Sequence, residues 1–543
     1  MFIFRKKILS NLNSLIIILI VNSSFILAST TKSVQSTYDW GSLNVGGGGF
    51  VSGIVVGKEE MYLRTDVGGA YKYDYINKKW TQLFNFIDEE NVGFLSVRGI
   101  AIDPTDDNIV YFLCGCAYLS DAKTVIYKTI DGGSTFTKID ITSLIQVNGN
   151  GDGRVCSEQI AINPDNPKMI YAGGDVTSGD SALIKSTDGG LTWKAVSGYN
   201  SLGFFKYELK WPSWSTHIVR GTSYEGYFKQ GGINAIKIYN GKIYVGTSVK
   251  GQYNIHIADV NKDSFSVLSY NLPTSNYPLT ITDDSNGNLF FTYISGLDFE
   301  GESGGAYKYV ISTKKVIDIS PASSAIDMIF ADKTDTNKLV TRTIGCWNSQ
   351  YWSVSGSTDP IAWGDYFYRS TDGGNSWTNI TPGQLISGNN YLSLPMIDNG
   401  YDWIVGKSIH WGAGIAIDPR NSNKIIMLSG NGVFACDNVW ESSNIQFYFD
   451  PKGVEETVPI DFINIKDGYS YSAILDYDGF IHKSIEEVGL QYTPNIGATG
   501  VIAYCNEDKN IMMRISNTDD IAYYSKDAGN NWIKMSSAGR EGS

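Results

Sequence analysis

The chain has 543 residues and a formal net charge of −13 at pH 7, from 43 Lys and Arg against 56 Asp and Glu. So acidic a chain has little with which to neutralise phosphates, which argues against nucleic-acid binding and makes a neutral polymer a better partner. Aromatic residues make up 13% of the chain, and 58 Gly accompany only 14 Pro, as in proteins of many short strands joined by glycine turns.

The N-terminus has the pattern of a secretory signal peptide. Residues 5–7 are Arg, Lys and Lys, an apolar run is centred on residues 15–21, and a small residue stands at Ala28. A single membrane anchor is the alternative, but polar residues 22–24 interrupt the run, which is short for a span. We expect residues 1–28 to be removed, and the mature chain to be secreted without membrane association.

Four hairpin motifs recur along the chain, each an Asp box in which an aspartate follows Ser or Thr by two residues and an aromatic residue closes the motif. The aspartate accepts backbone N–H groups within the turn, glycines take positive φ, and the aromatic side chain packs under the next strand. The motifs are TIDGGSTF at 129–136, STDGGLTW at 186–193, STDGGNSW at 370–377 and the weaker SKDAGNNW at 525–532.

A second unit repeats as a strand, a tight Asp-Pro or Asn-Pro turn and another strand. It begins at Gly99, Gln159 and Gly414. Paired strands that recur every ~40–50 residues are typical of β-propeller blades, and helical periodicity is nearly absent. We therefore predict an all-β propeller fold. The length corresponds to roughly ten to twelve blades, more than one ring of seven and fewer than two.

Other stretches are more selective than the Asp boxes, which sialidases and several binding propellers also carry. They are NVGGGGFVSG, MYLRTDVGGAYKYD, IHWGAGIAIDPRNSNKI, GVEETVPIDFI and SAILDYDGFIH. In this order they resemble glycoside hydrolase family 74, over about residues 38 to 535. The resemblance implies two seven-bladed propellers that hold a β-1,4-glucan between them and cleave it with inversion. It also implies the activity of a xyloglucan-active endoglucanase (xyloglucanase) or of a reducing-end-specific cellobiohydrolase.

The resemblance maps the family's two catalytic aspartates onto Asp66, as general base, and Asp476, as general acid. In an inverting glycosidase the two carboxyl groups stand roughly 6.5–9.5 Å apart, which admits the attacking water. Two alternatives stay open: Asp66 could serve only in an Asx turn, and Asp478 lies on the same face as Asp476 if the segment is extended. The acid needs a pKa raised by burial or by a nearby negative charge such as that of Asp478.

A cleft for a glucan also needs flat aromatic side chains, because the sugar rings expose apolar C–H faces. The aromatic residues of the Asp boxes are assigned to hairpin packing. The predicted substrate-binding residues are Trp347, Tyr351, Trp352, Trp363 and Trp411.

No metal or cofactor is expected, because the four His residues lie far apart and no CxxC is present. The stretch 148–159 partly matches a calcium loop, but its twelfth position is Gln159 instead of Glu, which favours a glycine-rich loop. No helix follows the four glycines at 46–49, so a phosphate-binding loop is not indicated. These glycines are expected to allow close backbone packing near the cleft.

We expect a seven-bladed propeller over residues 36–395 and part of a second over 396–543. The latter provides about three blades and would leave an unpaired edge strand. A truncated gene product, an incomplete sequence or a shortened natural variant would each explain this. The expected protein is a monomer that cleaves plant cell-wall xyloglucan or a related β-glucan. A propeller that only binds polysaccharide is the main alternative. A sialidase would need an arginine cluster and a tyrosine nucleophile, and a sorting-receptor propeller would have no reason to carry both aspartate motifs.

Overall fold

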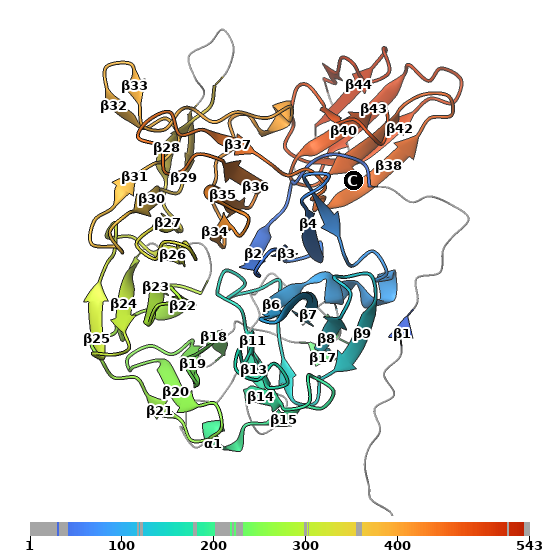
Figure 1. Cartoon of the computed structure of the whole chain (residues 1–543). Coiled ribbons are helices and arrows are strands. Elements are labelled where there is room, and N and C mark those ends of the chain that lie inside the picture. Colours follow the sequence, from blue (N-terminus) through green and yellow to red (C-terminus); the bar gives the residue numbers. More distant parts are fainter. Residues whose placement is uncertain are drawn as a thin grey trace, which may run out of the picture.

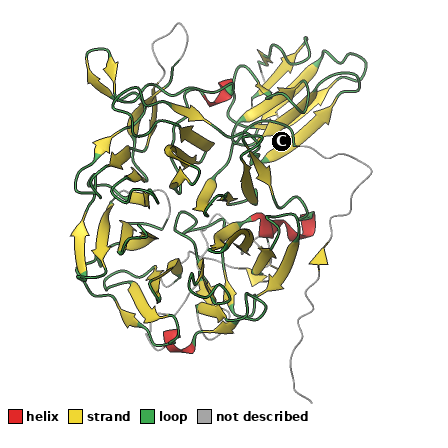
Figure 2. Cartoon of the chain, viewed as in Figure 1, coloured by secondary structure: helices red, strands yellow, loops and turns green. Residues whose placement is uncertain are grey.

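Strands dominate the chain. A computed structural model describes residues 30–31, 42–116, 119, 123–177, 182–200, 218–219, 222–223, 232–297, 301, 303–353, 361–517 and 521–536. The predicted signal peptide lies outside these residues. The helices are short (Figure 2): η1 (Glu89–Leu95), α1 (Ser197–Asn200) and η2 (Asp402–Ile404). No helix in the described part of the chain has the length and apolar character needed to cross a membrane. The predicted all-β class is confirmed.

Within the described residues, seven sheets form a closed ring, seen along its axis in Figure 1. Their first strands surround the centre, and each contacts the next in the order β2, β6, β11, β18, β22, β26 and β34. Strand β34 then contacts β2 and closes the ring. The predicted propeller is therefore confirmed, and its seven sheets are consecutive in sequence.

Each ring sheet is antiparallel and runs from an inner to an outer strand. Its strands are, in chain order, β2 (Val51–Val56), β3 (Met61–Thr65), β4 (Ala70–Asp74) and β5 (Lys79–Gln82); β6 (Val97–Asp103), β7 (Asp106–Cys114), β8 (Val125–Thr129) and β9 (Phe136–Asp140); β11 (Ile160–Ile162), β12 (Ile170–Gly173), β14 (Leu183–Ser186) and β15 (Lys194–Ala195); β18 (Ile233–Tyr239), β19 (Lys242–Thr247), β20 (Ile255–Asp259) and β21 (Ser266–Val267); β22 (Tyr277–Asp283), β23 (Asn288–Ile294), β24 (Gly304–Val310) and β25 (Lys315–Asp318); β26 (Ile326–Ala331), β27 (Leu339–Thr343), β30 (Phe367–Ser370) and β31 (Thr378–Asn379); β34 (Ile415–Asp418), β35 (Asn421–Ser429), β36 (Gly432–Cys436) and β37 (Phe447–Phe449).

Smaller pairings decorate the ring. Strand β1 adds to β9, and four two-stranded ribbons project from the loops. These strands are β1 (Thr30–Thr31), β10 (Ile145–Gln146) with β13 (Val176–Thr177), β16 (Ile218–Val219) with β17 (Thr222–Ser223), β28 (Asn348–Tyr351) with β29 (Ile361–Gly364), and β32 (Leu385–Ser387) with β33 (Asn390–Tyr391).

Two more four-stranded sheets lie outside the ring and form the lobe at the upper right of Figure 1. They pack on each other through β38, β39 and β42. The expected division at residue 395 falls before the seventh ring sheet, because β34 packs between β26 and β2. That the two outer sheets belong to a second propeller stays a prediction. Their strands are β38 (Pro459–Asn464), β39 (Ser470–Ile474), β40 (Asp478–His482) and β41 (Leu490–Gln491); β42 (Thr499–Tyr504), β43 (Met512–Ser516), β44 (Ala522–Ser525) and β45 (Ile533–Lys534).

The Asp boxes join the third and fourth strands of their sheets, as their turn chemistry predicts. In the β8–β9 turn, Asp131 Oδ1 accepts the Thr135 N–H at 2.9 Å, while Thr129 Oγ1 accepts the Gly133 N–H at 2.9 Å. The other three boxes repeat this pattern at Asp188, Asp372 and Asp527. These hydrogen bonds stabilise the carboxylate form, and they lower the pKa of Asp372 to about 2.

Candidate active site

Asp66 begins the loop between β3 and β4, in the first sheet of the ring. The residue before Asp66 closes this loop, because Thr65 Oγ1 accepts the Gly68 N–H at 2.8 Å and donates to the Gly69 carbonyl at 3.0 Å. An Asx turn would instead place a side-chain oxygen of Asp66 on the N–H two residues later. The structure gives that N–H to Thr65 and Glu456, so the turn does not require Asp66.

The Asp66 carboxyl is buried and paired. The residue is 6% exposed, and Arg154 Nη1 donates to Oδ2 at 2.8 Å. Arg154 also donates to Asn150 Oδ1 at 2.7 Å, which fixes the guanidinium at this place. Burial raises the pKa of Asp66, and the positive charge of Arg154 opposes that shift. Asp66 is thus a buried carboxyl whose ionised form has a dedicated cation.

A second buried carboxyl, Glu456, lies against the same loop. Its Oε1 accepts the N–H groups of Val67 at 3.3 Å and Gly68 at 3.2 Å, which places its carboxyl beside that of Asp66. Burial and the charge of Asp66 raise the pKa of Glu456 well above its usual range. Glu456 belongs to the GVEETVP motif that carries the family resemblance, but the sequence alone indicates no role for the glutamates of this motif.

The glycines at 46–49 pass through crowded space beside this pair. Gly46, Gly47 and Gly48 all have φ of 82°, which glycine adopts at little cost. A Cβ on Gly46 would lie 2.1 Å from the Tyr401 ring, and one on Gly49 would lie 2.2 Å from the Glu456 carbonyl oxygen. The prediction of close backbone packing is confirmed.

The two rival aspartates in the turn after β39 differ sharply. Asp478 is fully buried and pairs with Arg514 at 2.5 Å, and it accepts the Ile496 N–H at 3.0 Å. Asp476 is exposed to solvent. The structure therefore gives Asp478 a role inside the outer sheet and leaves Asp476 accessible to a substrate. It does not bury Asp476 as expected of the acid, and the charge of Asp478 is compensated by Arg514.

Tyr477 connects the two halves of the site. Its ring lies 3.5 Å from where a Cβ on Gly48 would stand, and its hydroxyl donates to Asn431 at 2.7 Å. Burial raises the pKa of this hydroxyl, and the neighbouring carboxyl groups of Asp476 and Glu456 add to the effect when they are ionised. Glu456 contacts the Asp66 loop and lies beside Gly49, and Tyr477 lies beside Gly48. Residues next to each of the two predicted catalytic aspartates therefore meet at this place.

An aromatic row leads to this place. The ring of His410 lies 5.3 Å from that of Trp347 and 4.6 Å from that of Trp411, centroid to centroid. Trp347 is 61% exposed and Trp411 is 39% exposed. The backbone of Gly430 separates Trp411 from Phe50, over whose ring the Arg154 guanidinium lies at 4.9 Å. The row thus runs from Trp347 to the cation that holds Asp66.

The other predicted substrate-binding residues divide. Trp352 is completely buried and donates through Nε1 to the Lys407 carbonyl at 2.7 Å, so its assignment to substrate binding is wrong. Trp363 is 58% exposed on the β28–β29 ribbon. Tyr351 lies beside Gly383 and lines a pocket of about 540 Å³ with polar and aromatic neighbours. Roles for Trp363 and Tyr351 stay predictions.

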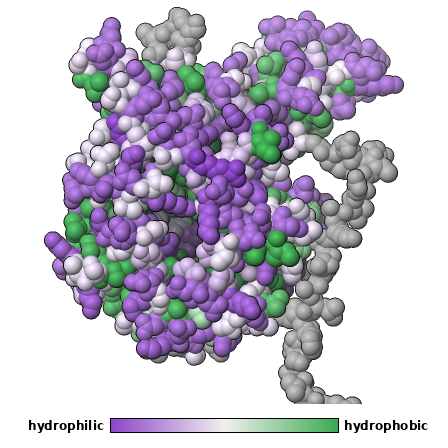
Figure 3. Space-filling view, in the orientation of Figure 1, coloured by the Kyte–Doolittle hydropathy of each residue, from purple (hydrophilic) through white to green (hydrophobic). Residues whose placement is uncertain are grey.

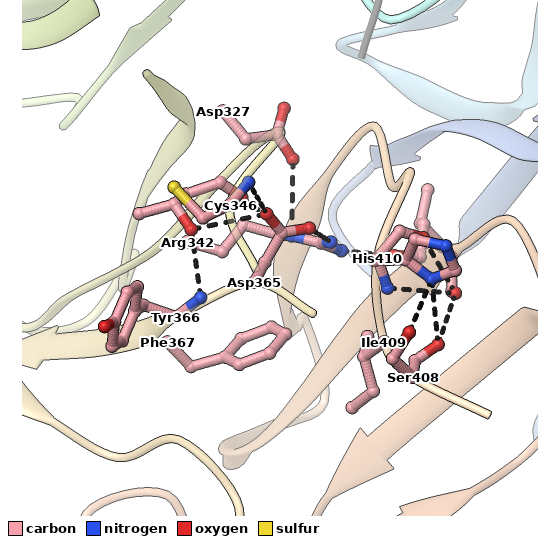
Figure 4. A network of polar contacts seen from close by, with 12 residues as sticks. Asp327, Arg342, Cys346, Asp365, Tyr366, Phe367, Ser408, Ile409 and His410 are labelled. Carbon is pink, nitrogen blue, oxygen red and sulfur yellow. Dashed lines mark hydrogen bonds and ion pairs between the residues drawn. The ribbon is translucent and has the colours of Figure 1, made fainter. Parts of the chain in front are cut away.

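A buried polar network holds the segment that carries His410 and Trp411 (Figure 4). Arg342 Nη2 donates to Asp365 Oδ2 at 2.6 Å, and Asp327 Oδ2 accepts the Gly414 N–H at 2.7 Å. Burial raises the pKa of Asp327 to about 7 and lowers that of His410 to about 4. His410 is therefore neutral above pH 5 and presents a ring instead of a charge.

The loop at 148–159 is tied into the fold by hydrogen bonds. Asp175 accepts the Asn148 N–H at 2.7 Å and the Gln159 side-chain amide at 2.5 Å. The first and twelfth positions of the stretch that partly matches a calcium loop are thus both hydrogen-bonded to one aspartate.

Figure 3 shows the face of the ring that is turned toward the viewer in Figure 1, and this face is mostly hydrophilic.

Comparison with known proteins places these features in context. No protein-family model matches the chain. Xyloglucanase Xgh74A of Acetivibrio thermocellus is 28% identical, over 97% of this chain and 64% of that protein. The oligoxyloglucan-reducing end-specific xyloglucanase of Emericella nidulans is 24% identical, over 93% and 67%. The crystal structure of the GH74 enzyme of Niastella koreensis superposes with a TM-score of 0.77 at 30% identity, over 92% of this chain and 68% of that one.

Proposed function

The chain belongs to glycoside hydrolase family 74, and on this premise we propose that it is a secreted, inverting glycosidase that hydrolyses the β-1,4-glucan backbone of xyloglucan. The xyloglucanase names of its relatives support the substrate class. The chain spans 64% of the length of Xgh74A. The activity and the substrate of this chain are therefore inferred from its own site. The sequence of residues 1–28 supports secretion.

One observation carries the proposal: a buried aspartate with a dedicated arginine and an exposed aspartate adjoin one connected cluster at the end of an aromatic row. Asp66 is paired with Arg154, Asp476 neighbours Tyr477, and Glu456 lies against both the Asp66 loop and the glycines that pack on Tyr477. A purely structural aspartate would look like Asp478, with every oxygen bonded inside a sheet.

The chemistry assigns one proton transfer to each aspartate. Asp66, kept ionised by Arg154, accepts a proton from a water that attacks the anomeric carbon from the face opposite the leaving group. Asp476, as the general acid, gives a proton to the glycosidic oxygen as the C–O bond breaks. The elements of water are added across that bond, and the configuration at the anomeric carbon inverts.

The aromatic row provides the binding surface. Trp347 and Trp411 expose flat faces on either side of the neutral His410. Such faces pack against the apolar C–H faces of glucose units, and an uncharged row suits an uncharged polymer. The row ends at Phe50 beside Arg154, and so it leads a bound chain to Asp66. An endo mode of attack is proposed with the xyloglucanase type of activity.

The test is the release of reducing ends from xyloglucan by the secreted protein, with Asp66→Asn and Asp476→Asn beside it. We expect release by the wild type and loss of at least ~10³-fold in both variants. Proton NMR of the first product should show the α anomer from a β-linked substrate. A folded wild type that is retained on xyloglucan but releases nothing would instead establish a polysaccharide-binding propeller.

A further inference from the structure

Asp66 and Glu456 are two carboxyl groups in one buried space. Asp66 is 6% exposed and Glu456 is 3% exposed, and the Glu456 carboxyl is held beside Asp66 by the N–H groups of Val67 and Gly68, the two residues that follow it. A hydrogen bond between two carboxyl groups needs a proton on one of them. Two adjacent ionised carboxylates at such a place would repel each other strongly. The pair therefore holds one proton that the hydrolytic scheme has not used.

The surroundings put this proton on Glu456. Arg154 donates to Asp66 Oδ2 and favours a negative charge there. Oε1 of Glu456 accepts two backbone N–H groups, and within the described part of the chain no N–H or O–H group donates to its Oε2. A protonated Oε2 needs an acceptor instead of a donor, and the carboxylate of Asp66 is that acceptor.

We propose that Glu456 is a positioning residue for hydrolysis: as a neutral carboxylic acid it donates a hydrogen bond to Asp66, which keeps the base ionised and fixes its rotamer. The proposal rests on the proposed function, because it names Asp66 as the base. This role explains the GVEETVP motif in physical terms. Glu456 lies in the loop that follows the last ring sheet, and it holds the loop that follows β3. The supporting contact joins residues 388 positions apart, Gly68 and Glu456.

The charged and titratable groups around the pair come from every element packed against it. They are Arg154 from the loop after β10, Tyr71 on β4, Tyr477 in the β39–β40 turn, and Glu455 next in the chain. Arg154 is the cation among them. Burial raises the pKa of the Tyr71 and Tyr477 hydroxyls, so both tyrosines stay neutral at the pH of the reaction.

Two substitutions separate donation from packing. Glu456→Gln keeps an acceptor for the Val67 and Gly68 N–H groups and presents an NH₂ donor to Asp66. Glu456→Leu removes both. The hydrogen bond from Glu456 lowers the pKa of Asp66, so its loss raises that pKa and moves the acidic limb of kcat/KM to higher pH. We expect a shift of about one pH unit in the leucine variant and none in the glutamine variant.

Glu455→Gln is the matched control, because Glu455 is the adjacent glutamate but accepts the N–H groups of Val45 and Gly46. Its acidic limb should coincide with that of the wild type. A leucine variant that loses activity with an unmoved limb would overturn the proposal in favour of packing. A glutamine variant that shifts like leucine would also overturn it.

A measurement without substrate tests the proton itself. Wild-type Glu456 stays protonated in the folded chain above pH 4.5, whereas in the unfolded chain it ionises near that pH. Stability of the wild type relative to Glu456→Gln should therefore fall as pH rises from 4.5, measured by urea unfolding. Parallel curves would overturn the protonated state. This readout remains if the wild type cleaves no xyloglucan or the leucine variant does not fold, so failure of the proposed function is distinguishable.

Discussion

Arg154 Nη1 lies 2.8 Å from Asp66 Oδ2, although the two residues are 88 positions apart in the chain. The loop that carries Arg154 reaches across from the next sheets of the ring, and Asn150 and the Phe50 ring hold the guanidinium there. Burial raises the pKa of Asp66, and the charge of Arg154 opposes that shift, as the proposed role of Asp66 as a general base requires.

Arg154→Ala should therefore lower kcat/KM on xyloglucan by about 10²-fold, the cost typical of losing one charged contact at a reacting centre. It should also move the acidic limb of the pH profile upward, because the charge of Arg154 lowers the pKa of Asp66. Arg154→Lys should keep part of the activity, since it retains the charge but not the planar fork. An alanine variant with wild-type rates at pH 5 would contradict the assignment of Asp66.

Asp476 and Asp478, two residues apart, allow a catalytic role and a structural role to be tested against each other. Asp478→Asn breaks a fully buried pair with Arg514, and we expect it to lower the free energy of unfolding by about 3–5 kcal/mol. Asp476→Asn changes an exposed side chain and should leave that free energy within ~0.5 kcal/mol while abolishing hydrolysis. Urea unfolding and reducing-end assays on the same preparations give both values. The roles are reversed if Asp478→Asn is stable and inactive.

Trp347 and Trp352 form a second matched pair, five residues apart. Trp347→Ala removes an exposed face of the aromatic row, and binding of a xyloglucan oligosaccharide should weaken about tenfold, or ~1.4 kcal/mol, with little effect on stability. Trp352→Ala empties a fully buried site and should cost about 3–5 kcal/mol of folding stability. Calorimetric titration and thermal unfolding distinguish the two effects. Equal binding by Trp347→Ala and wild type would remove Trp347 from the substrate surface.

The sequence predicts what is encoded locally. Each Asp box builds its own turn from residues within eight positions, as at Thr129, Asp131 and Thr135, so the propeller class could be read from the repeats. The sheet that closes the ring could not be identified from the repeats, because closure depends on β34 packing against β2, the inner strand of the first ring sheet. The expected boundary at residue 395 followed the family resemblance, and it falls one sheet before the end of the ring.

The site shows the same division. The pairing of Trp352 with Lys407 and the exposure of Trp347 depend on which face of a short segment turns inward, and spacing in an aromatic-rich stretch does not reveal that. Strand alternation gave no signal for the burial of Trp352, since Gln350, two residues earlier, is a polar residue that the structure also buries. The role of Glu456 depends on a contact with a loop 388 residues earlier, so its motif could be noticed without its function.

Glu455 predicts a pH dependence of stability that is separate from catalysis. Burial raises its pKa from 4.5 to about 8, against the effect of the Val45 and Gly46 N–H groups that it accepts. The folded chain then holds a proton that the unfolded chain releases. Its contribution to stability is complete below pH 4.5 and is lost as pH rises through about 8, at up to ~1.4 kcal/mol per pH unit.

Glu455→Gln removes this titration, so the free energy of unfolding of the wild type should fall relative to the variant between pH 5 and pH 8. Urea unfolding at three pH values in this window gives the slope, and Glu487→Gln, at an exposed position, should follow the wild type. A rise in wild-type stability relative to Glu455→Gln would mean that the backbone N–H groups outweigh burial and that Glu455 is ionised. The glycine segment at 46–49 would then be held by an ionised carboxylate instead of a neutral carboxylic acid.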